Sequence, residues 1–121
     1  MNDQATELKA RTKKFALDVI RFVRLLPRTD EGRIVGGQLI RAATGVGANY
    51  RAVCRSRSRA EFVARLGVAL EEADESAFWL EIIVELRMVA GNRAAKLLDE
   101  ANQLTAILAA SSITASEEHK R

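Results

Sequence analysis

The chain has 121 residues, of which 48% are hydrophobic and 29% charged, an ordinary balance for one globular domain with a single core. One proline and an aromatic content of 5% favour an all-helical chain over a β-sandwich. The net charge of +3 is unevenly distributed: residues 1–65 carry fourteen Lys or Arg against six Asp or Glu, and residues 66–121 carry five against ten. We therefore expect one all-α domain over residues 1–121, whose basic and acidic parts are satisfied by each other or by an external polyanion.

Cysteine and histidine are too scarce for most kinds of site chemistry. The single cysteine, Cys54, allows no intrachain disulfide and no cysteine metal cluster, and we interpret it as a small apolar residue at a helix end. The single histidine, His119, cannot supply the Glu-x-x-His pairs that a di-iron bundle needs alongside the acidic run over residues 71–85. No histidine is placed to activate a serine or cysteine nucleophile. We expect a non-enzyme with no catalytic residue, no metal, no cofactor and no small-molecule substrate.

The first half of the chain contains two stretches with apolar residues at helical spacing. A helix is predicted over residues 7–26, after a disordered start over residues 1–6, and Pro27 should stop it. Asp30 is a candidate N-cap for a second helix over residues 31–55. The first helix carries charged residues within its apolar run, so it is neither a signal peptide nor a membrane span. We expect a cytoplasmic protein with no membrane partner.

The second half contains two further helical stretches. Ser58-Arg59-Ala60-Glu61 fits the capping box, which predicts a third helix over residues 59–89, ended by Gly91. A fourth helix is predicted over residues 93–110, followed by a loose tail over residues 111–121. All three connections are short, so neighbouring helices must run antiparallel. The predicted fold is an antiparallel up-down four-helix bundle.

The second predicted helix carries an unusual number of small residues on one side: Gly36, Gly37, Ala43, Gly45, Gly47 and Ala48. Glycine is a poor helix former, by about 1 kcal/mol relative to alanine. The small residues therefore need a structural reason. We expect close approach of another helix, with a frayed or kinked helix as the alternative.

The same region carries a resemblance to a known family. The segment from Gln38 to Arg51 (QLIRAATGVGANYR), the segment from Arg57 to Phe62 (RSRAEF) and the stretch from Ala69 to Trp79 together resemble the "four helix bundle protein" family. This family is also called the ribosomal RNA intervening-sequence or S23 family. The resemblance implies an up-down bundle that assembles as a ring-shaped homopentamer. It also implies a link to nucleic acid, because the family is associated with intervening sequences in ribosomal RNA.

A group of arginines surrounds the turn between the second and third predicted helices: Arg51, Arg55, Arg57, Arg59 and Arg65. We call this turn with its five arginines the arginine turn. Arginine forks suit phosphate groups, and the free N–H groups at the start of the third helix favour an anion at the same place. Tyr50 could stack on a base, although a core or interface position suits it better. The alternative for the arginines is a solvated helix end or salt bridges between subunits.

Other residues are candidates for an interface between subunits: Tyr50, Glu71, Glu75, Phe78 and Trp79. Phe78 and Trp79 are adjacent on a helix and must diverge, so one can face the core while the other faces a partner.

Two hypotheses for the function remain open. The protein is a homo-oligomeric scaffold or adaptor that binds RNA or DNA without sequence preference through its arginine turn, or it is a pure protein-interaction module whose charges serve only assembly.

Overall fold

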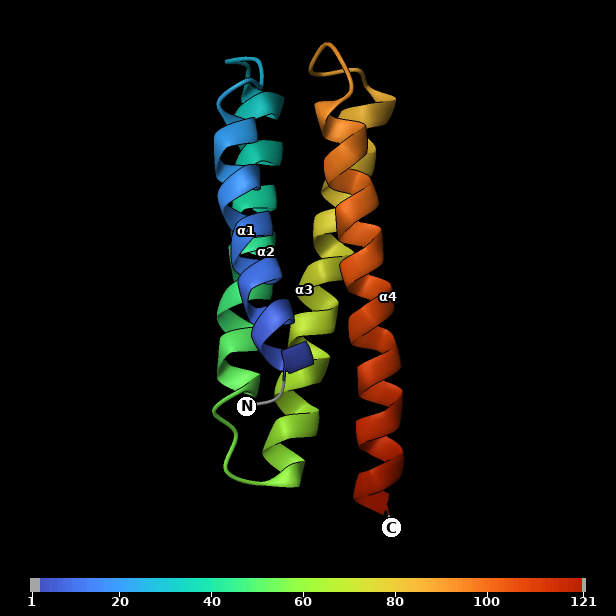
Figure 1. The fold of residues 1–121 in the computed structure, drawn as a ribbon. Coiled ribbons are helices and arrows are strands. Elements are labelled where there is room, and N and C mark those ends of the chain that lie inside the picture. The colour runs from blue at the N-terminus through green and yellow to red at the C-terminus, as the bar shows by residue number, and fades with distance from the viewer. Residues whose placement is uncertain (1–2, 121) are drawn as a thin grey trace.

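The computed structural model describes residues 3–120, which form four helices: α1 (Asp3–Val23), α2 (Asp30–Val53), α3 (Arg59–Glu85) and α4 (Arg93–Lys120). Each helix runs antiparallel to the one before it and packs against it, and α1 and α4 also contact each other, less extensively (Figure 1). The predicted all-α, up-down four-helix bundle is confirmed. The α2–α3 connection, which carries the arginine turn, lies at the opposite end of the bundle from the α1–α2 connection.

The apolar stripes seen in the sequence form the core. In α2 the apolar residues that recur at helical spacing are all buried: Val35, Leu39, Ala42, Val46, Tyr50 and Val53. Phe15, Val19 and Phe22 of α1 are buried against them, as are Leu104 and Leu108 of α4. Each fully buried large apolar side chain contributes about 1.5–3 kcal/mol relative to exposure. The helical period thus predicted which face of each helix points inward.

Two of the small residues of α2 allow close approach of α1. A Cβ at Gly36 would lie 2.9 Å from Val23 Cγ1 of α1, and a Cβ at Gly47 would lie 3.4 Å from the Thr12 carbonyl oxygen. A Cβ at Gly37, in contrast, would meet nothing within 4 Å. The helix is continuous from Asp30 to Val53. Close packing therefore explains Gly36 and Gly47, whereas Gly37 stands in open space.

The beginnings of α2 and α3 differ in how well the sequence predicted them. Ser58 is the N-cap of α3, as predicted, and its hydroxyl accepts a hydrogen bond from the Glu61 N–H at 3.1 Å. The Glu61 carboxylate pairs with Arg65, which lies one turn further along α3. The prediction that Asp30 caps α2 is wrong by one residue: Thr29 is the N-cap, and its hydroxyl accepts from the Gly32 N–H. Asp30 occupies the first turn, where a carboxylate also suits the helix dipole.

The end of α3 comes earlier than predicted. The helix stops at Glu85 rather than at residue 89, because Arg87 adopts a left-handed conformation with a φ of 50°. The Met88 N–H donates to the Ile83 carbonyl and the Arg87 N–H donates to the Val84 carbonyl, which is the Schellman pattern. An arginine thus holds the position that usually takes glycine. Gly91 also has a positive φ, of 82°, but it lies within the following loop.

Both chain ends are more helical than predicted. Residues 3–6 belong to α1, and residues 111–120 continue α4. At its other end α1 is shorter than predicted: its last residue is Val23 rather than residue 26. The expectations of a disordered start and a loose tail are therefore wrong over these residues; residues 1, 2 and 121 lie outside the described part of the chain. Ala115 shows why α4 continues: its side chain is only 3% exposed, so the last turns still pack against the bundle.

Burying Ala115 makes the last turns of α4 testable. Ala115→Asp should lower the free energy of unfolding by about 1–3 kcal/mol, because a polar group would be buried without a partner. Thr114→Asp, at an exposed neighbouring position, is the matched control and should change stability by less than about 0.5 kcal/mol. Urea unfolding of both variants measures the difference. Equal stability of the two variants would contradict the packing of residues 111–120.

Candidate functional site

The arginine turn lies in the α2–α3 connection and the helix ends beside it (Figure 1). Arg55 and Arg57 are exposed in the connection, and Arg51 is exposed on the last turn of α2. Among residues 3–120, none of these three guanidinium groups has an acidic partner within 4.0 Å. The structure therefore brings three unpaired cations to one end of the bundle.

The other two predicted arginines are already engaged. Arg59 forms an ion pair with Glu118 at 3.1 Å, and its guanidinium lies 5.7 Å from the centre of the Phe62 ring. Arg65 donates to the Ala52 carbonyl oxygen at 2.8 Å, which satisfies one of the last carbonyls of α2, and also pairs with Glu61. The role of Arg65 in this chain is to hold α3 to the end of α2. The helical end of α4 brings Glu118 to the turn, which the prediction of a loose tail did not anticipate.

The surface of the turn is shallow and contains no aromatic platform from Tyr50. A hollow of about 380 Å³ is lined by Ser56, Arg57, Ser58, Arg59 and Phe62. Tyr50 is only 7% exposed, and burial raises the pKa of its hydroxyl to about 12. Tyr50 is thus buried in the core of this chain, which disfavours stacking of its ring on a base; its assignment to a subunit interface stays a prediction. Any anion at the turn would meet arginine side chains and backbone N–H groups.

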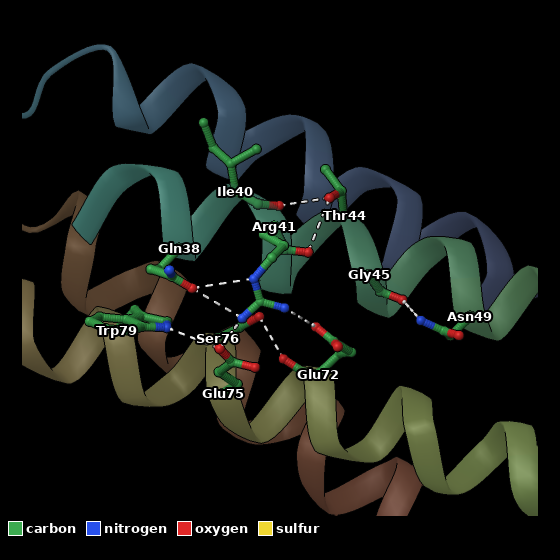
Figure 2. Close-up of polar contacts among 10 residues, drawn as sticks. All are labelled: Gln38, Ile40, Arg41, Thr44, Gly45, Asn49, Glu72, Glu75, Ser76 and Trp79. Atoms are coloured by element: carbon green, nitrogen blue, oxygen red, sulfur yellow. Dashed lines mark hydrogen bonds and ion pairs between the residues drawn. The ribbon is translucent and has the colours of Figure 1, made fainter. Parts of the chain in front are cut away.

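A second polar cluster, which the sequence analysis missed, lies between α2 and α3 (Figure 2). Arg41 is at its centre: its guanidinium pairs with Glu75, lies 3.7 Å from Glu72 Oε2 and donates to Gln38 Oε1 at 3.2 Å. Trp79 Nε1 lies 3.4 Å from the same Glu75 carboxylate. The acidic run of α3 is therefore partly neutralised within the chain. The available signal was the position of Arg41 in an α2 stretch that faces an acidic helix.

Glu72 is the least satisfied member of this cluster. Its Oε2 atom is buried and has no hydrogen-bond partner within the described residues. Burial raises the pKa of the Glu72 carboxyl, and the Arg41 charge opposes that rise. Gly45 makes room for this carboxylate, because a Cβ there would lie 2.7 Å from Oε2. The close approach expected at Gly45 thus accommodates an acidic side chain rather than a backbone.

The remaining polar residues of the cluster bond to their own helices. Thr44 donates to the Ile40 carbonyl at 2.7 Å, Asn49 Nδ2 donates to the Gly45 carbonyl, and Ser76 donates to the Glu72 carbonyl, both at 2.8 Å. Within residues 3–120 no three His, Cys, Asp or Glu side chains are grouped so that they could hold a metal ion. In that same range, no helix is long and apolar enough to cross a membrane. The α2–α3 cluster is best interpreted as a structural contact between helices.

Phe78 and Trp79 diverge as expected. The two rings meet edge to face with centres 5.1 Å apart, but Trp79 packs against the core whereas Phe78 is 51% exposed. Glu71, also predicted for an interface, is exposed on the same side of α3 and unpaired within residues 3–120. Glu75 has Arg41 of its own chain as a partner. Of the predicted interface residues, Phe78 and Glu71 are the two that are exposed, whereas Glu75 and Trp79 are partly buried and Tyr50 is buried.

The contact between Gly45 and Glu72 predicts a difference between two glycines of α2. Gly37→Ala should raise the free energy of unfolding by about 0.5–1 kcal/mol, because alanine is the better helix former and the site is open. Gly45→Ala should raise the free energy of unfolding by less, because the new methyl group displaces the Glu72 carboxylate from Arg41. In a Glu72→Ala background, the two glycine substitutions should raise the free energy of unfolding by similar amounts. A double-mutant cycle by urea unfolding measures this difference. Equal gains at both glycines would contradict this contact.

The raised pKa of Glu72 predicts the sign of a pH effect. A carboxyl whose pKa is higher in the folded chain than its unfolded value of about 4.3 stabilises the fold when protonated, and this contribution is lost as the pH rises through the folded-state pKa. Glu72→Gln should therefore stabilise the protein at neutral pH, and the gain should shrink as the pH falls through that pKa. Urea unfolding at several pH values measures this gain. A gain that grows on acidification would contradict the burial of the charge.

Glu71→Gln is the matched control for this experiment. Glu71 is exposed on the same helix and has no ion-pair partner among the described residues. Its replacement should change stability by less than about 0.5 kcal/mol at neutral pH.

Comparison with known proteins places the chain in a family. Residues 4–110 match the family described as "23S rRNA-intervening sequence protein", which has no known catalytic activity. The chain is also similar to a protein of unknown function from the S23 ribosomal protein family of Bacteroides thetaiotaomicron, with 24% identity, a TM-score of 0.79, and coverage of 87% of this chain and 97% of that one. At this identity the likeness shows a shared fold. No curated protein matches. Because the family match spans nearly all of the bundle, the chain belongs to the 23S rRNA-intervening sequence protein family.

Proposed function

We propose that this protein is a non-enzymatic homo-oligomeric scaffold that binds RNA or DNA through phosphate contacts of its arginine turn. The observation that carries the proposal is the group of three exposed arginines, Arg51, Arg55 and Arg57, which have no acidic partner among residues 3–120. Exposed like charges at one end of a bundle repel one another, and a polyanion relieves that repulsion. The family resemblance, with its link to ribosomal RNA intervening sequences, points the same way.

The chemistry of the turn suits phosphate oxygens. A guanidinium presents its donors as a planar fork that matches two phosphate oxygens. The hollow beside Arg57 lies at the N-terminus of α3, where the first N–H groups of a long helix favour an anion. Backbone contacts of this kind position a nucleic acid without reading its bases. With Tyr50 buried, Phe62 is the aromatic side chain that lines the hollow, and stacking on an aromatic ring discriminates little between bases, so binding should be insensitive to sequence.

The scaffold part of the proposal rests on exposed apolar surface. Phe78 and Val68 are exposed on α3, and Ile34 is exposed on α2. Assembly would remove such apolar side chains from water, which favours association. A homopentamer is the assembly that the family resemblance implies, and it would multiply the arginine turns available to one nucleic-acid strand.

One observation favours the second candidate, a pure assembly module. Arg59 and Arg65 are both occupied by acids of the same chain, Glu118 and Glu61. If the remaining arginines meet acids of another subunit, the turn would serve assembly alone. The two functions differ in what removing Arg55 and Arg57 does, because one predicts lost nucleic-acid binding and the other a smaller assembly.

The double variant Arg55→Ala/Arg57→Ala tests the proposal. It should bind RNA and DNA more weakly, flatten the dependence of affinity on salt by up to about two units per chain, and affect different sequences equally. Fluorescence anisotropy with a labelled RNA and a labelled duplex, across a salt titration, measures binding. Light scattering on the same samples measures the mass, which should not change.

A matched control is available at the other end of the bundle. Arg24 and Arg28 are also exposed and have no ion pair among the described residues, so Arg24→Ala/Arg28→Ala removes the same charge far from the turn. An equal loss of binding in the control would mean that net charge, rather than the turn, attracts the nucleic acid. No binding by the unmodified protein at low salt would refute the nucleic-acid function, and a smaller assembly in the turn variant would favour the second candidate.

A further inference from the structure

A groove runs between α1 and α2 on the outside of the bundle. Its volume is about 400 Å³, and it is lined by Thr6, Lys9, Ala10, Lys13 and Ala16 of α1 and by Thr44, Gly47, Ala48 and Arg51 of α2. The small residues keep its floor low and apolar, and Gly47 lets the α1 backbone come close. The groove therefore offers apolar surface that the chain itself does not cover.

The cations on the rim of this groove are unpaired, unlike others on the same helix. Lys14 pairs with Asp18 at 2.6 Å, and Arg11 pairs with Glu100 at 2.7 Å. Lys9 and Lys13, in contrast, have no ion-pair partner among residues 3–120, and neither does Arg51 across the groove. The groove thus combines an apolar floor with three uncompensated positive charges.

The complementary surface lies on α3. Phe78 is exposed there, and so are three acids, Glu71, Asp74 and Glu81. Glu71 lies seven residues and Asp74 four residues before Phe78, whereas Glu81 lies three residues after it. This spacing places all four side chains on one side of the helix. We name these four residues the α3 ridge. None of its three acids has an ion-pair partner in the described part of the chain, whereas Glu75, on the side nearer α2, is neutralised by Arg41.

We propose that the α1–α2 groove receives the α3 ridge of a second copy of this chain. Phe78 of one copy would lie on the floor formed by Ala48 and Gly47 of the next, with the ridge acids beside Lys9 and Lys13. The contact buries an exposed aromatic side chain and pairs charges that have no ion-pair partner among residues 3–120 of their own chain. This inference rests on the proposed self-assembly and identifies the surfaces that would perform it.

The two surfaces also determine the symmetry of the contact. The groove belongs to α1 and α2, and the ridge belongs to α3, so one copy contributes a different surface from its neighbour (Figure 1). Such a heterologous contact leaves a free groove at one end and a free ridge at the other. Repeated addition closes into a ring if the rotation between copies allows it, and otherwise makes an open chain.

Charge reversal on either surface, followed by reversal on both, tests the pairing. Lys9→Glu/Lys13→Glu and Glu71→Lys/Glu81→Lys should each reduce the mass seen by light scattering toward the 13.3 kDa of a single chain. The chain that carries all four substitutions should regain the assembly, because the exchanged charges attract again. Phe78→Ala should weaken assembly at any salt concentration, and Ala48→Trp, which fills the groove, should do the same.

Two controls separate this inference from the proposal on which it rests. Arg24→Glu/Arg28→Glu reverses two unpaired cations away from the groove, and Leu86→Ala removes an exposed apolar side chain outside the ridge, so neither should change the mass. A monomeric unmodified protein at tens of micromolar would overturn self-assembly and this inference together. An assembly that survives reversal on either surface would overturn only the inference. Loss of RNA binding without loss of mass in the Lys9/Lys13 variant would assign the groove to phosphate instead.

Discussion

The close packing of α2 against its two neighbours is the constraint on which the rest of the structure depends. Gly36 and Gly47 let α1 approach on one side, and Gly45 admits the Glu72 side chain of α3 on the other. Glycine weakens a helix in water, so α2 gains its stability from the side chains that it buries rather than from its own propensity. The same small residues shape the outside of the bundle, because the floor of the α1–α2 groove is made of Gly47, Ala48 and two alanines of α1.

The distribution of charge follows from this packing. The acidic α3 lies beside α2, so Arg41 can neutralise Glu75 and approach Glu72 within one chain. Other charges have no ion-pair partner in the part of the chain that the structure describes: the arginines of the α2–α3 connection, the lysines of the groove and the acids around Phe78. Surface ion pairs contribute little to the stability of a single chain. Uncompensated charges gathered on opposite surfaces matter more for association, where complementary potentials guide partners together.

Much of the fold could be predicted because it depends on local and periodic features. The spacing of Val35, Leu39 and Val46 placed the buried face of α2, and Ser58 placed the start of α3. The errors lie where a local signal competes with a tertiary one. Ser111 and its polar neighbours favour a tail by composition, but burial of Ala115 extends α4 past them. Gly91 predicts a later end for α3, but the chain turns at Arg87. There the Met88 and Arg87 N–H groups donate hydrogen bonds to the Ile83 and Val84 carbonyls and end the helix.

The candidate sites divide in the same way. Local sequence predicts that arginines gather at one turn, that acids gather on one helix and that Phe78 and Trp79 point apart, because each of these features depends on residues close together in the chain. Which of those groups are free depends instead on how the four helices pack. Arg59 meets Glu118 across fifty-nine positions of sequence, and Tyr50 is buried in a core cluster to which all four helices contribute. Ion pairing and burial depend on which helix is the neighbour and on its position along the bundle axis. The helical period of a sequence predicts neither the neighbour nor that position.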